Sequence, residues 1–481
     1  MLLTLVILYL LVTIGIGLLA ARRVKNAADF AIAGRHLPMY MIVTTTFATW
    51  FGSETVLGIP AKFIQGGLGN VVEDPFGAGL CLVLVGLFFA AKLYRMTLLT
   101  ISDYYRERYG RAVEVVCSLI IMLSYLGWVS AQVTALGLVF NLLSGGAIAV
   151  STGMVIGVLS ILAYTLFGGM WSVAVTDFIQ MIILVAGLSI IAVFAAGMAG
   201  GPAKVIDLAA SRDLFRFLPE PSFHDLVFFI AAGVTMMFGS IPQQDVFQRV
   251  MSAADLKAAT RGPVIGGLCY ILFAFVPMFL VASALIIMPA ETAALLKDDP
   301  QKVLPTLVLA KMPFVMQVLF FGALLSALKS TASATLLAPS VTFTENIWRQ
   351  FRPHVSDKEH LRTMRITTLV FSVLVLVYAI HMEGTSIYEL VSGAYQVPLV
   401  GAFVPLVAGL YWKRATTQGA IFAIVLGLLA WVIFLATPAG EQFPAQLAGL
   451  LAALAGMLIG SLGPQAIRNA HASHHRMAGM A

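Results

Sequence analysis

The sequence has 481 residues, of which 60% are hydrophobic and only 11% are charged. Soluble domains carry roughly 45–50% apolar and about 25% charged residues, so this composition excludes a soluble protein and predicts an all-α polytopic membrane protein. The net charge of +6 is concentrated in short loops between apolar segments. Basic residues there anchor a protein at the cytoplasmic face of the lipid bilayer, and no nucleic-acid partner is needed to explain them.

Apolar runs of about 20 residues, long enough to cross a ~30 Å hydrocarbon core, recur along the whole chain. We expect thirteen spans, at residues 2–21, 38–66, 72–94, 113–142, 146–167, 173–199, 223–246, 262–289, 305–346, 363–381, 385–411, 418–437 and 443–463. No basic residue precedes the first span, and Arg22 and Arg23 follow it, so we expect a retained helix rather than a cleaved signal. Basic residues in alternate loops predict a bacterial-type inner membrane protein with its N-terminus outside and its C-terminus in the cytoplasm.

Two of these spans are interrupted in comparable ways. Glycine, serine and proline break the second span over residues 52–60 and the seventh over residues 239–242. Each break opens a run of five spans, and because five is odd the second run must enter the membrane with opposite polarity. Matching breaks in two inverted halves indicate a transporter site between them, although glycine and proline kinks are also common in ordinary membrane helices.

This pattern predicts the domain organisation. We expect a peripheral first helix and cytoplasmic loop (1–37), inverted repeat 1 (38–199), an external loop (200–222), inverted repeat 2 (223–412), peripheral spans 12 and 13 (413–463) and a cytoplasmic tail (464–481). The histidines of the tail are interpreted as part of a disordered segment rather than a metal site. Because no nucleotide-binding loop, nucleophile–base pair or metal cluster stands out, we expect neither an enzyme nor a cofactor.

Ionisable residues inside membrane spans are costly and usually functional. We expect Glu54, in the first break, and Asp177, in the sixth span, to be buried carboxylates. Asp245 and Glu389 lie near the ends of spans, where water could reach them.

Lys329 lies in the middle of a span, in the segment "SALKSTASATLL". The next charged residue downstream is Glu345, roughly 24 Å away at 1.5 Å per helical residue, so the lysine cannot easily reach that membrane surface. Ser330 and Thr331 follow it directly, and hydroxyl groups beside unwound carbonyls are hard donors suited to an alkali cation. Small hydroxylated residues also simply allow close packing of membrane helices.

Six segments, in this order and spacing, resemble the sodium/solute symporter family over essentially the whole chain. They are "FAIAGRHLP", "FATWFGSETVLGIPAKF", "TISDYYRERYG", "GGMWSVAVTDFIQ", "GSIPQQDVFQRVMSA" and "SALKSTASATLL". The resemblance implies an amino-acid-transporter-like fold of 13 spans with a five-plus-five inverted-repeat core. It also implies a monomer that imports a small organic solute by alternating access, with Na+ as coupling ion. The sodium ligands it implies are Ala48, Phe51, Ala327, Ser330 and Thr331, with the family's conserved aspartate at Asp177.

Within the family, "ATW" at 48–50, "RVMSA" after the seventh span and "SDKEHLRTMRIT" at 356–367 are most similar to the choline-transporter branch. That likeness implies an aromatic cage that holds an amine by cation–π attraction. Trp50 and Trp128 match two tryptophans of the cage, whereas Gln243 stands at the position of the third. The substrate site we expect comprises Trp50, Gly52, Ser53, Trp128, Gln243 and Gln244.

Lys329 and Glu54 depart from the family pattern. Because positions 326, 329, 330 and 333 share a helical face, we expect Lys329, Ser333, Asp177 and Glu54 to form a charge network near the ion. Lys329 could pair with Asp177 or Glu54, with Glu54 otherwise free for an amine substrate. It could instead occupy the sodium position, which would make transport proton-coupled or sodium-independent, or face a water-filled vestibule. A transporter-like sensor, which would need a separate partner, is the alternative class.

Overall fold

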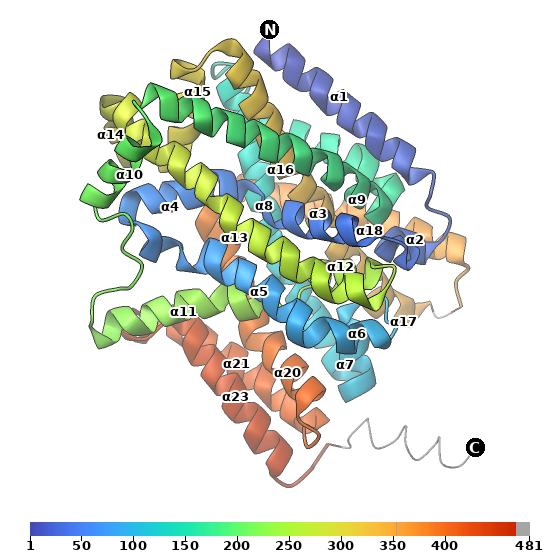
Figure 1. Ribbon diagram of the computed structural model, residues 1–481. Coiled ribbons are helices and arrows are strands. Elements are labelled where there is room, and N and C mark those ends of the chain that lie inside the picture. Colours follow the sequence, from blue (N-terminus) through green and yellow to red (C-terminus); the bar gives the residue numbers. More distant parts are fainter. Residues whose placement is uncertain (353, 468–481) are drawn as a thin grey trace.

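The computed structural model describes residues 1–352 and 354–467, and over these residues the chain forms helices joined by short loops (Figure 1). The tail histidines, which follow Arg468, lie outside the described residues. Ten of the described helices are long and apolar enough to cross a membrane, or eleven if a bent pair counts as one span. That pair is α11 (Phe223–Gly239) and α12 (Gln244–Ser252), which meet at 46°.

Two interrupted elements explain the remaining difference between this count and the thirteen spans that we expected. α9 (Val150–Met198) is counted once, although Gly169 breaks it with φ 46° and ψ −140° between the expected fifth and sixth spans. A Cβ at Gly169 would lie 2.3 Å from the carbonyl oxygen of Phe30, so only glycine fits this position. α3 (Met39–Trp50) and α4 (Ile59–Gly66) are both short because the chain unwinds after Trp50 and then forms a separate π-helical turn over residues 54–58.

The other elements follow in chain order. They are α1 (Leu2–Ala21), α2 (Ala27–Ile32), η1 (Ala33–Arg35), η2 (Glu54–Gly58), η3 (Leu68–Val71), η4 (Val72–Gly77), α5 (Ala78–Leu84), η5 (Val85–Phe89), α6 (Ala90–Arg95), α7 (Ile101–Tyr109), α8 (Arg111–Leu143), α10 (Pro202–Ser211), α13 (Leu256–Ile287), α14 (Pro289–Asp298), η6 (Pro300–Lys302), α15 (Val303–Lys311), α16 (Phe314–Thr342), η7 (Phe343–Trp348), α17 (Arg349–Phe351), α18 (Asp357–His381), α19 (Ile387–Pro398), η8 (Leu399–Phe403), α20 (Val404–Tyr411), α21 (Thr417–Ala436), α22 (Ala439–Gln442) and α23 (Ala445–Leu462).

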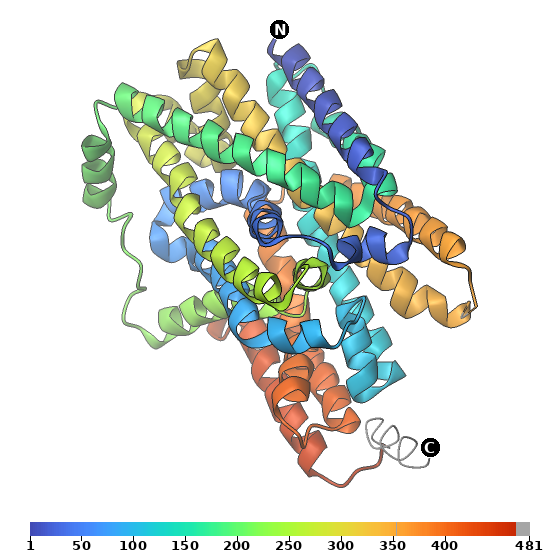
Figure 2. The ribbon, with the colours of Figure 1, turned by 45° about the vertical axis from the view of Figure 1, so that its right-hand side comes forward.

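Two peripheral units flank the central bundle. α1 runs along one flank against α9 and α16, and α21 packs on α23 at the other side of the molecule (Figures 1 and 2). Large apolar side chains such as Leu8, Leu11 and Leu19 of α1 are exposed, as expected for a surface that faces lipid. The binding residues must therefore come from the helices between these two units.

α16 lies at the centre of the bundle. Every residue from 323 to 342 is buried, which fits a helix without a distinct polar face. This stretch nevertheless contains serines, threonines and Lys329, and buried polar groups require hydrogen-bond partners. The partners of these side chains therefore indicate which neighbouring elements form the site.

The first break lies beside α16. α3 ends at Trp50, because Phe51 adopts φ −91° and ψ 66°, and helical geometry returns at Ser53. The last carbonyls of a helix have no partner within the helix, so this break leaves oxygen acceptors at membrane depth. Unwound backbone is tolerated there only where it lines a cavity or binds something. The boundaries of the two inverted repeats, 38–199 and 223–412, stay a prediction.

Candidate functional site

Asp177 of α9 joins three helices. One carboxylate oxygen accepts a hydrogen bond of 2.5 Å from the Ser330 hydroxyl of α16, and the other accepts one of 2.5 Å from the Thr45 hydroxyl of α3. Asp177 is fully buried, as expected from the sequence. These contacts hold α16 beside the end of α3 and fix the orientation of the Ser330 side chain.

The expected ion ligands gather at the junction of α3 and α16. The Thr331 hydroxyl donates across 3.5 Å to the carbonyl oxygen of Ala48, in the last turn of α3. Phe51 is the unwound residue after this turn, and Ala327 lies one helical turn before Thr331 on α16. All of these residues are buried. Hydroxyl and carbonyl oxygens of this kind could hold an alkali cation.

Lys329 points away from this junction. Its ammonium donates a hydrogen bond of 2.6 Å to the Thr13 hydroxyl of α1 and lies 5.2 Å from the centre of the Tyr164 ring. Within residues 1–352 and 354–467, no carboxylate lies within 4.0 Å of it, so the expected ion pair with Asp177 or Glu54 is absent. Lys329 is also fully buried, which excludes an open vestibule around it.

The residues at 326–333 that we expected to share one helical face therefore contact different neighbours. Ser326 is hydrogen-bonded to Tyr9 of α1, next to the contact between Lys329 and Thr13. Ser330 is turned toward Asp177 instead, because consecutive helical residues differ by about 100° around the axis. Ser333 donates to the backbone carbonyl of Ser330 at 3.0 Å. Lys329 thus occupies neither the ion junction nor a network with Asp177 and Glu54.

Glu54 is buried in the first break, as expected, with 1% of its surface exposed. One carboxylate oxygen accepts from the Trp128 indole N–H at 3.1 Å. The other accepts from the Gln132 amide at 2.6 Å and from the Ser53 hydroxyl at 3.3 Å. The backbone N–H of Ser53 donates to Gln132 Oε1 at 2.8 Å, which fixes the orientation of the amide. Glu54 thus connects the break to α8.

Three aromatic rings cluster together beside Trp128, whose indole binds this carboxylate. Trp50 and Trp128 lie 5.6 Å apart, and Tyr395 of α19 lies 5.9 Å from Trp50 and 5.3 Å from Trp128. The expected third position, Gln243, instead donates to the Ser124 hydroxyl at 2.8 Å. Reasoning from the sequence missed Tyr395, because a tyrosine in an apolar span is most simply explained as a core residue.

The other expected substrate residues have different surroundings. A Cβ at Gly52 would lie 2.7 Å from Glu54 Oε2, 2.7 Å from the Thr331 hydroxyl and 2.8 Å from Gln132 Oε1. Gly52 therefore lies directly between the Glu54 carboxylate and the expected ion ligand Thr331. Gln244 accepts a hydrogen bond of 2.8 Å from the backbone N–H of Ile101, at the start of α7.

The expectation for the two remaining acids was half right. Glu389 is solvated, with 60% of its side chain exposed, and it pairs with Lys62 at 3.4 Å. Asp245 is fully buried, because the helix restarts at Gln244 and turns it toward Tyr125, whose hydroxyl donates to it at 2.6 Å. Arg249 is buried as well, and it binds the Thr49 hydroxyl and the Asp245 carbonyl.

Comparisons with known proteins identify the family. Residues 30–427 match the model of the Sodium:solute symporter family. The chain belongs to this family. This sodium:solute symporter is 27% identical to the human high affinity choline transporter 1, over 92% of this chain and 77% of the relative. It is also 27% identical to the sodium/pantothenate symporter of Escherichia coli, over 95% of this chain and 96% of the relative.

Solved structures establish the fold. A Na+-coupled sialic acid symporter in a substrate-bound outward-open state superposes with a TM-score of 0.83 at 20% identity, covering 96% of this chain and 97% of the other. Mhp1, a nucleobase-cation-symport-1 family transporter, superposes with a TM-score of 0.60 at 16% identity over 90% of this chain and 94% of the other. The expected symporter fold is confirmed, and this multi-pass membrane protein belongs to a family of transporters rather than enzymes.

A cavity approaches the site of this symporter from the end that carries residues 383–389. Its volume is about 500 Å³, and its lining includes Gly58, Lys62, Thr134 and Tyr388. Gly58 lies one helical turn beyond Glu54, and Thr134 lies two residues beyond Gln132 on α8. The lining therefore shares the segments that carry Glu54 and Gln132, although neither of these two residues lines the cavity itself.

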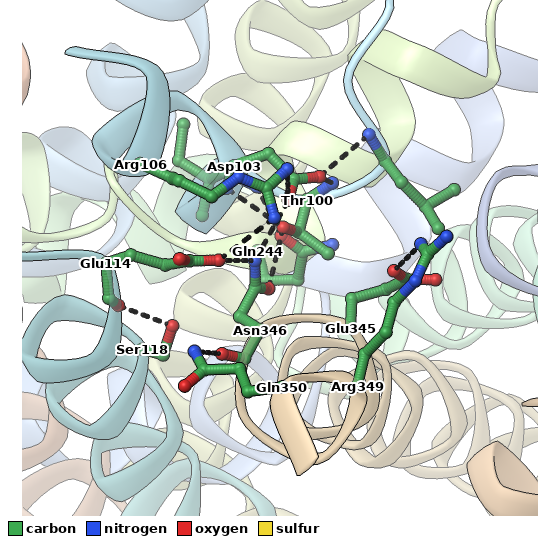
Figure 3. Close-up of polar contacts among 12 residues, drawn as sticks. Thr100, Asp103, Arg106, Glu114, Ser118, Gln244, Glu345, Asn346, Arg349 and Gln350 are labelled. Atoms are coloured by element: carbon green, nitrogen blue, oxygen red, sulfur yellow. Dashed lines mark hydrogen bonds and ion pairs between the residues drawn. The ribbon is translucent and has the colours of Figure 1, made fainter. Parts of the chain in front are cut away.

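A polar network joins several elements at the opposite end of the symporter (Figure 3). Asn346, just after α16, donates to Asp103 at 3.0 Å and to Glu114 at 2.9 Å, and accepts from the Thr100 hydroxyl at 2.7 Å. Arg106 bridges the same two acids, with 3.0 Å to Asp103 and 3.4 Å to Glu114. The network joins α7, α8 and the end of α16, close to the contact between Gln244 and α7.

Proposed function

We propose that this symporter imports a small organic solute by alternating access and that a sodium ion drives it. The observation that carries the proposal is the contact of the Thr331 hydroxyl with the Ala48 carbonyl, beside a Ser330 hydroxyl held by Asp177. A sodium ion bound by Ala48, Phe51, Ala327, Ser330 and Thr331 would join α16 to the broken α3. An ion that binds one conformation more tightly than the other shifts the population toward it.

The orientation is part of the same proposal. We place the N-terminus outside and the C-terminus in the cytoplasm of a bacterial-type inner membrane, because basic residues concentrate in the loops at the end that holds the Asn346 network. The cavity above Glu54 would then open to the outside, and the network around Asn346 would close the cytoplasmic end. The protein would work as a monomer.

Uptake into proteoliposomes, with and without an inward sodium gradient, tests the sodium proposal. For Ser330→Ala and Thr331→Ala, we expect the sodium concentration for half-maximal uptake to rise about tenfold or more, because each variant removes one hard oxygen ligand. Ser340→Ala is the matched control, since its hydroxyl only bonds the carbonyl of Leu336 in the same helix. Wild-type uptake that ignores sodium and follows a proton gradient would contradict the proposal, and a protein that accumulates no solute would favour a sensor.

Asn346→Ala tests the proposed cytoplasmic closure. The change removes the amide that separates Asp103 from Glu114, so we expect the inward-open conformation to become more populated. Cys117 lies buried one turn beyond Glu114, and its labelling by a thiol reagent added from the cytoplasmic side should increase several-fold, in a Cys269→Ser background. Sodium should slow the labelling.

Ser118→Ala is the control for this experiment, because the Ser118 hydroxyl donates only to the Glu114 backbone within α8. Equal labelling of Cys117 in Asn346→Ala and in the parent would show that the network does not hold this end closed.

A further inference from the structure

The buried centre contains a carboxylate without a cation. Every donor to Glu54 is neutral, namely the Trp128 indole, the Gln132 amide and the Ser53 hydroxyl. Among the described residues, no lysine, arginine or histidine nitrogen lies within 4.0 Å of it. An ionised carboxylate at membrane depth is costly unless a positive charge pairs with it.

The protein's own buried cations are held elsewhere. Lys329 binds Thr13 on the far side of α16, and Arg249 binds Thr49 and the Asp245 carbonyl. The hydrogen-bond donors around Glu54 stabilise its ionised form and so oppose the effect of burial. An indole can only donate, and the amide of Gln132 presents its NH₂ because its oxygen already accepts from Ser53. A cation supplied by a ligand would therefore complete the site.

The surroundings of Glu54 suit an ammonium group better than a second metal ion. The ring of Trp128, whose indole N–H donates to Glu54, packs against those of Trp50 and Tyr395, and aromatic faces attract organic cations. Sodium, in contrast, needs several oxygen ligands. The indole N–H of Trp50 and the hydroxyl of Tyr395 are buried and have no partner among the described residues. Buried polar atoms of this kind point to a ligand that satisfies them.

We propose that the imported solute carries a protonated amine with at least one N–H, and that Glu54 is the residue that binds it. The assignment rests on the proposed transport function and names its substrate class. A carboxylate gains most from a cation that can donate a hydrogen bond to it, which a quaternary ammonium cannot do. Glu54 thus selects primary to tertiary amines over quaternary ones.

The route from the cavity supports the same charge. Glu73 lines a second cavity of about 500 Å³ that shares Lys62 and Tyr388 with the first. Asp74, the next residue, is buried and accepts a hydrogen bond of 2.5 Å from Tyr270, whose hydroxyl lies 2.9 Å from that of Thr55, the neighbour of Glu54. Both linings also contain basic residues, among them Lys62, Lys302 and Arg216, but acidic residues outnumber them in each cavity. A net negative lining raises the local concentration of cations.

The binding of the amine would also be linked to that of sodium. Glu54 Oε2 and the Thr331 hydroxyl both lie 2.7 Å from the Cβ position of Gly52. The ammonium and the ion would therefore contact the same unwound segment, and the negative charge of Glu54 would offset the repulsion between the two cations. Each cation should strengthen the binding of the other.

Thermal unfolding of the purified full-length protein, without any gradient, tests the assignment. The probes are ethanolamine, N,N-dimethylethanolamine and choline, which keep the alcohol and remove N–H groups stepwise, and a set of larger primary amines, each matched with its N-acetyl derivative. Ligands that bind the folded state raise its melting temperature. We expect stabilisation by an amine, none by its acetylated partner and less by choline than by ethanolamine.

Glu54→Gln keeps the shape of the side chain and should weaken the binding of the stabilising amine about tenfold or more. Its melting temperature without ligand shows whether it folds. Thr331→Ala should still bind the amine, but sodium should no longer increase its affinity for the amine. The two variants therefore distinguish the loss of the sodium site from the loss of the amine site.

Three results would overturn the assignment. The first is that choline binds as well as ethanolamine, and the second is that Glu54→Gln binds the amine with unchanged affinity. The third is that no amine stabilises the protein. A Glu54→Gln variant that loses sodium binding alone would make Glu54 an ion ligand instead.

Discussion

Gly52→Ala is expected to lower solute uptake about tenfold or more while the protein still folds. Gly52 does not adopt a positive φ, so alanine is compatible with its backbone, and the effect arises from the space around the Cβ. That atom would lie 2.7–2.8 Å from Glu54 Oε2, the Thr331 hydroxyl and Gln132 Oε1. All three oxygens must move, and overpacking of a tight site costs about 1–3 kcal/mol. Because 1.4 kcal/mol corresponds to a tenfold change in affinity, uptake should fall by about tenfold or more.

The matched control is Gly393→Ala on α19. Its Cβ would meet no atom within 4 Å, although it lies two residues from Tyr395. Uptake at saturating sodium and the melting temperature should both be measured, since the site and not the fold is affected. Normal uptake by Gly52→Ala would show that the Glu54 carboxylate and the Thr331 hydroxyl do not act together.

The breaks could be predicted from the sequence because they are local. Gly52 and Ser53 follow directly on the end of α3, and Gly239 and Ser240 lie at the end of α11. The carboxylates Glu54 and Asp177 could be identified as buried because they lie within apolar spans. Asp245 was misplaced because it lies close to the end of a span, and only the geometry of the restarted helix turns it inward.

The partners of the buried groups could not be predicted in the same way. Thr45, Gln132 and Tyr395 come from α3, α8 and α19, so their contacts depend on how distant segments pack. Our prediction that Lys329 points toward Asp177 and Glu54 was wrong for a related reason. Its neighbour Ser330 faces α9 and α3, but a helix turns by about 100° per residue, and the peripheral α1 covers the face on which Lys329 lies.

The contact between α1 and α16 leads to a prediction about stability. Lys329 has no carboxylate partner among the described residues, and its ammonium relies on the Thr13 hydroxyl, which donates in turn to the Leu10 carbonyl at 2.9 Å. Thr13→Val removes this acceptor and leaves a buried charge without its hydrogen bond. A hydrogen bond to a charged group contributes about 1.5–3 kcal/mol, so we expect a melting temperature several degrees lower.

Lys329→Met should have the opposite effect, since methionine fills much of the same volume without a buried charge, and such replacements are often neutral or stabilising. In the Lys329→Met background, Thr13→Val should then cost little, because the two changes remove the same interaction. Lys358→Met, at an exposed lysine of α18, is the control for the loss of a positive charge.

Sodium dependence separates this structural role from a role in coupling. Because Lys329 faces α1 while Ser330 and Thr331 face the α3 break, Lys329→Met should keep the wild-type sodium concentration for half-maximal uptake. The opposite result would be a wild-type protein whose uptake ignores sodium and a Lys329→Met variant whose uptake requires it. In that case the ammonium of Lys329 would take the place of the ion in another conformation. The same variant therefore distinguishes a lysine that holds the peripheral helix from one that takes part in transport.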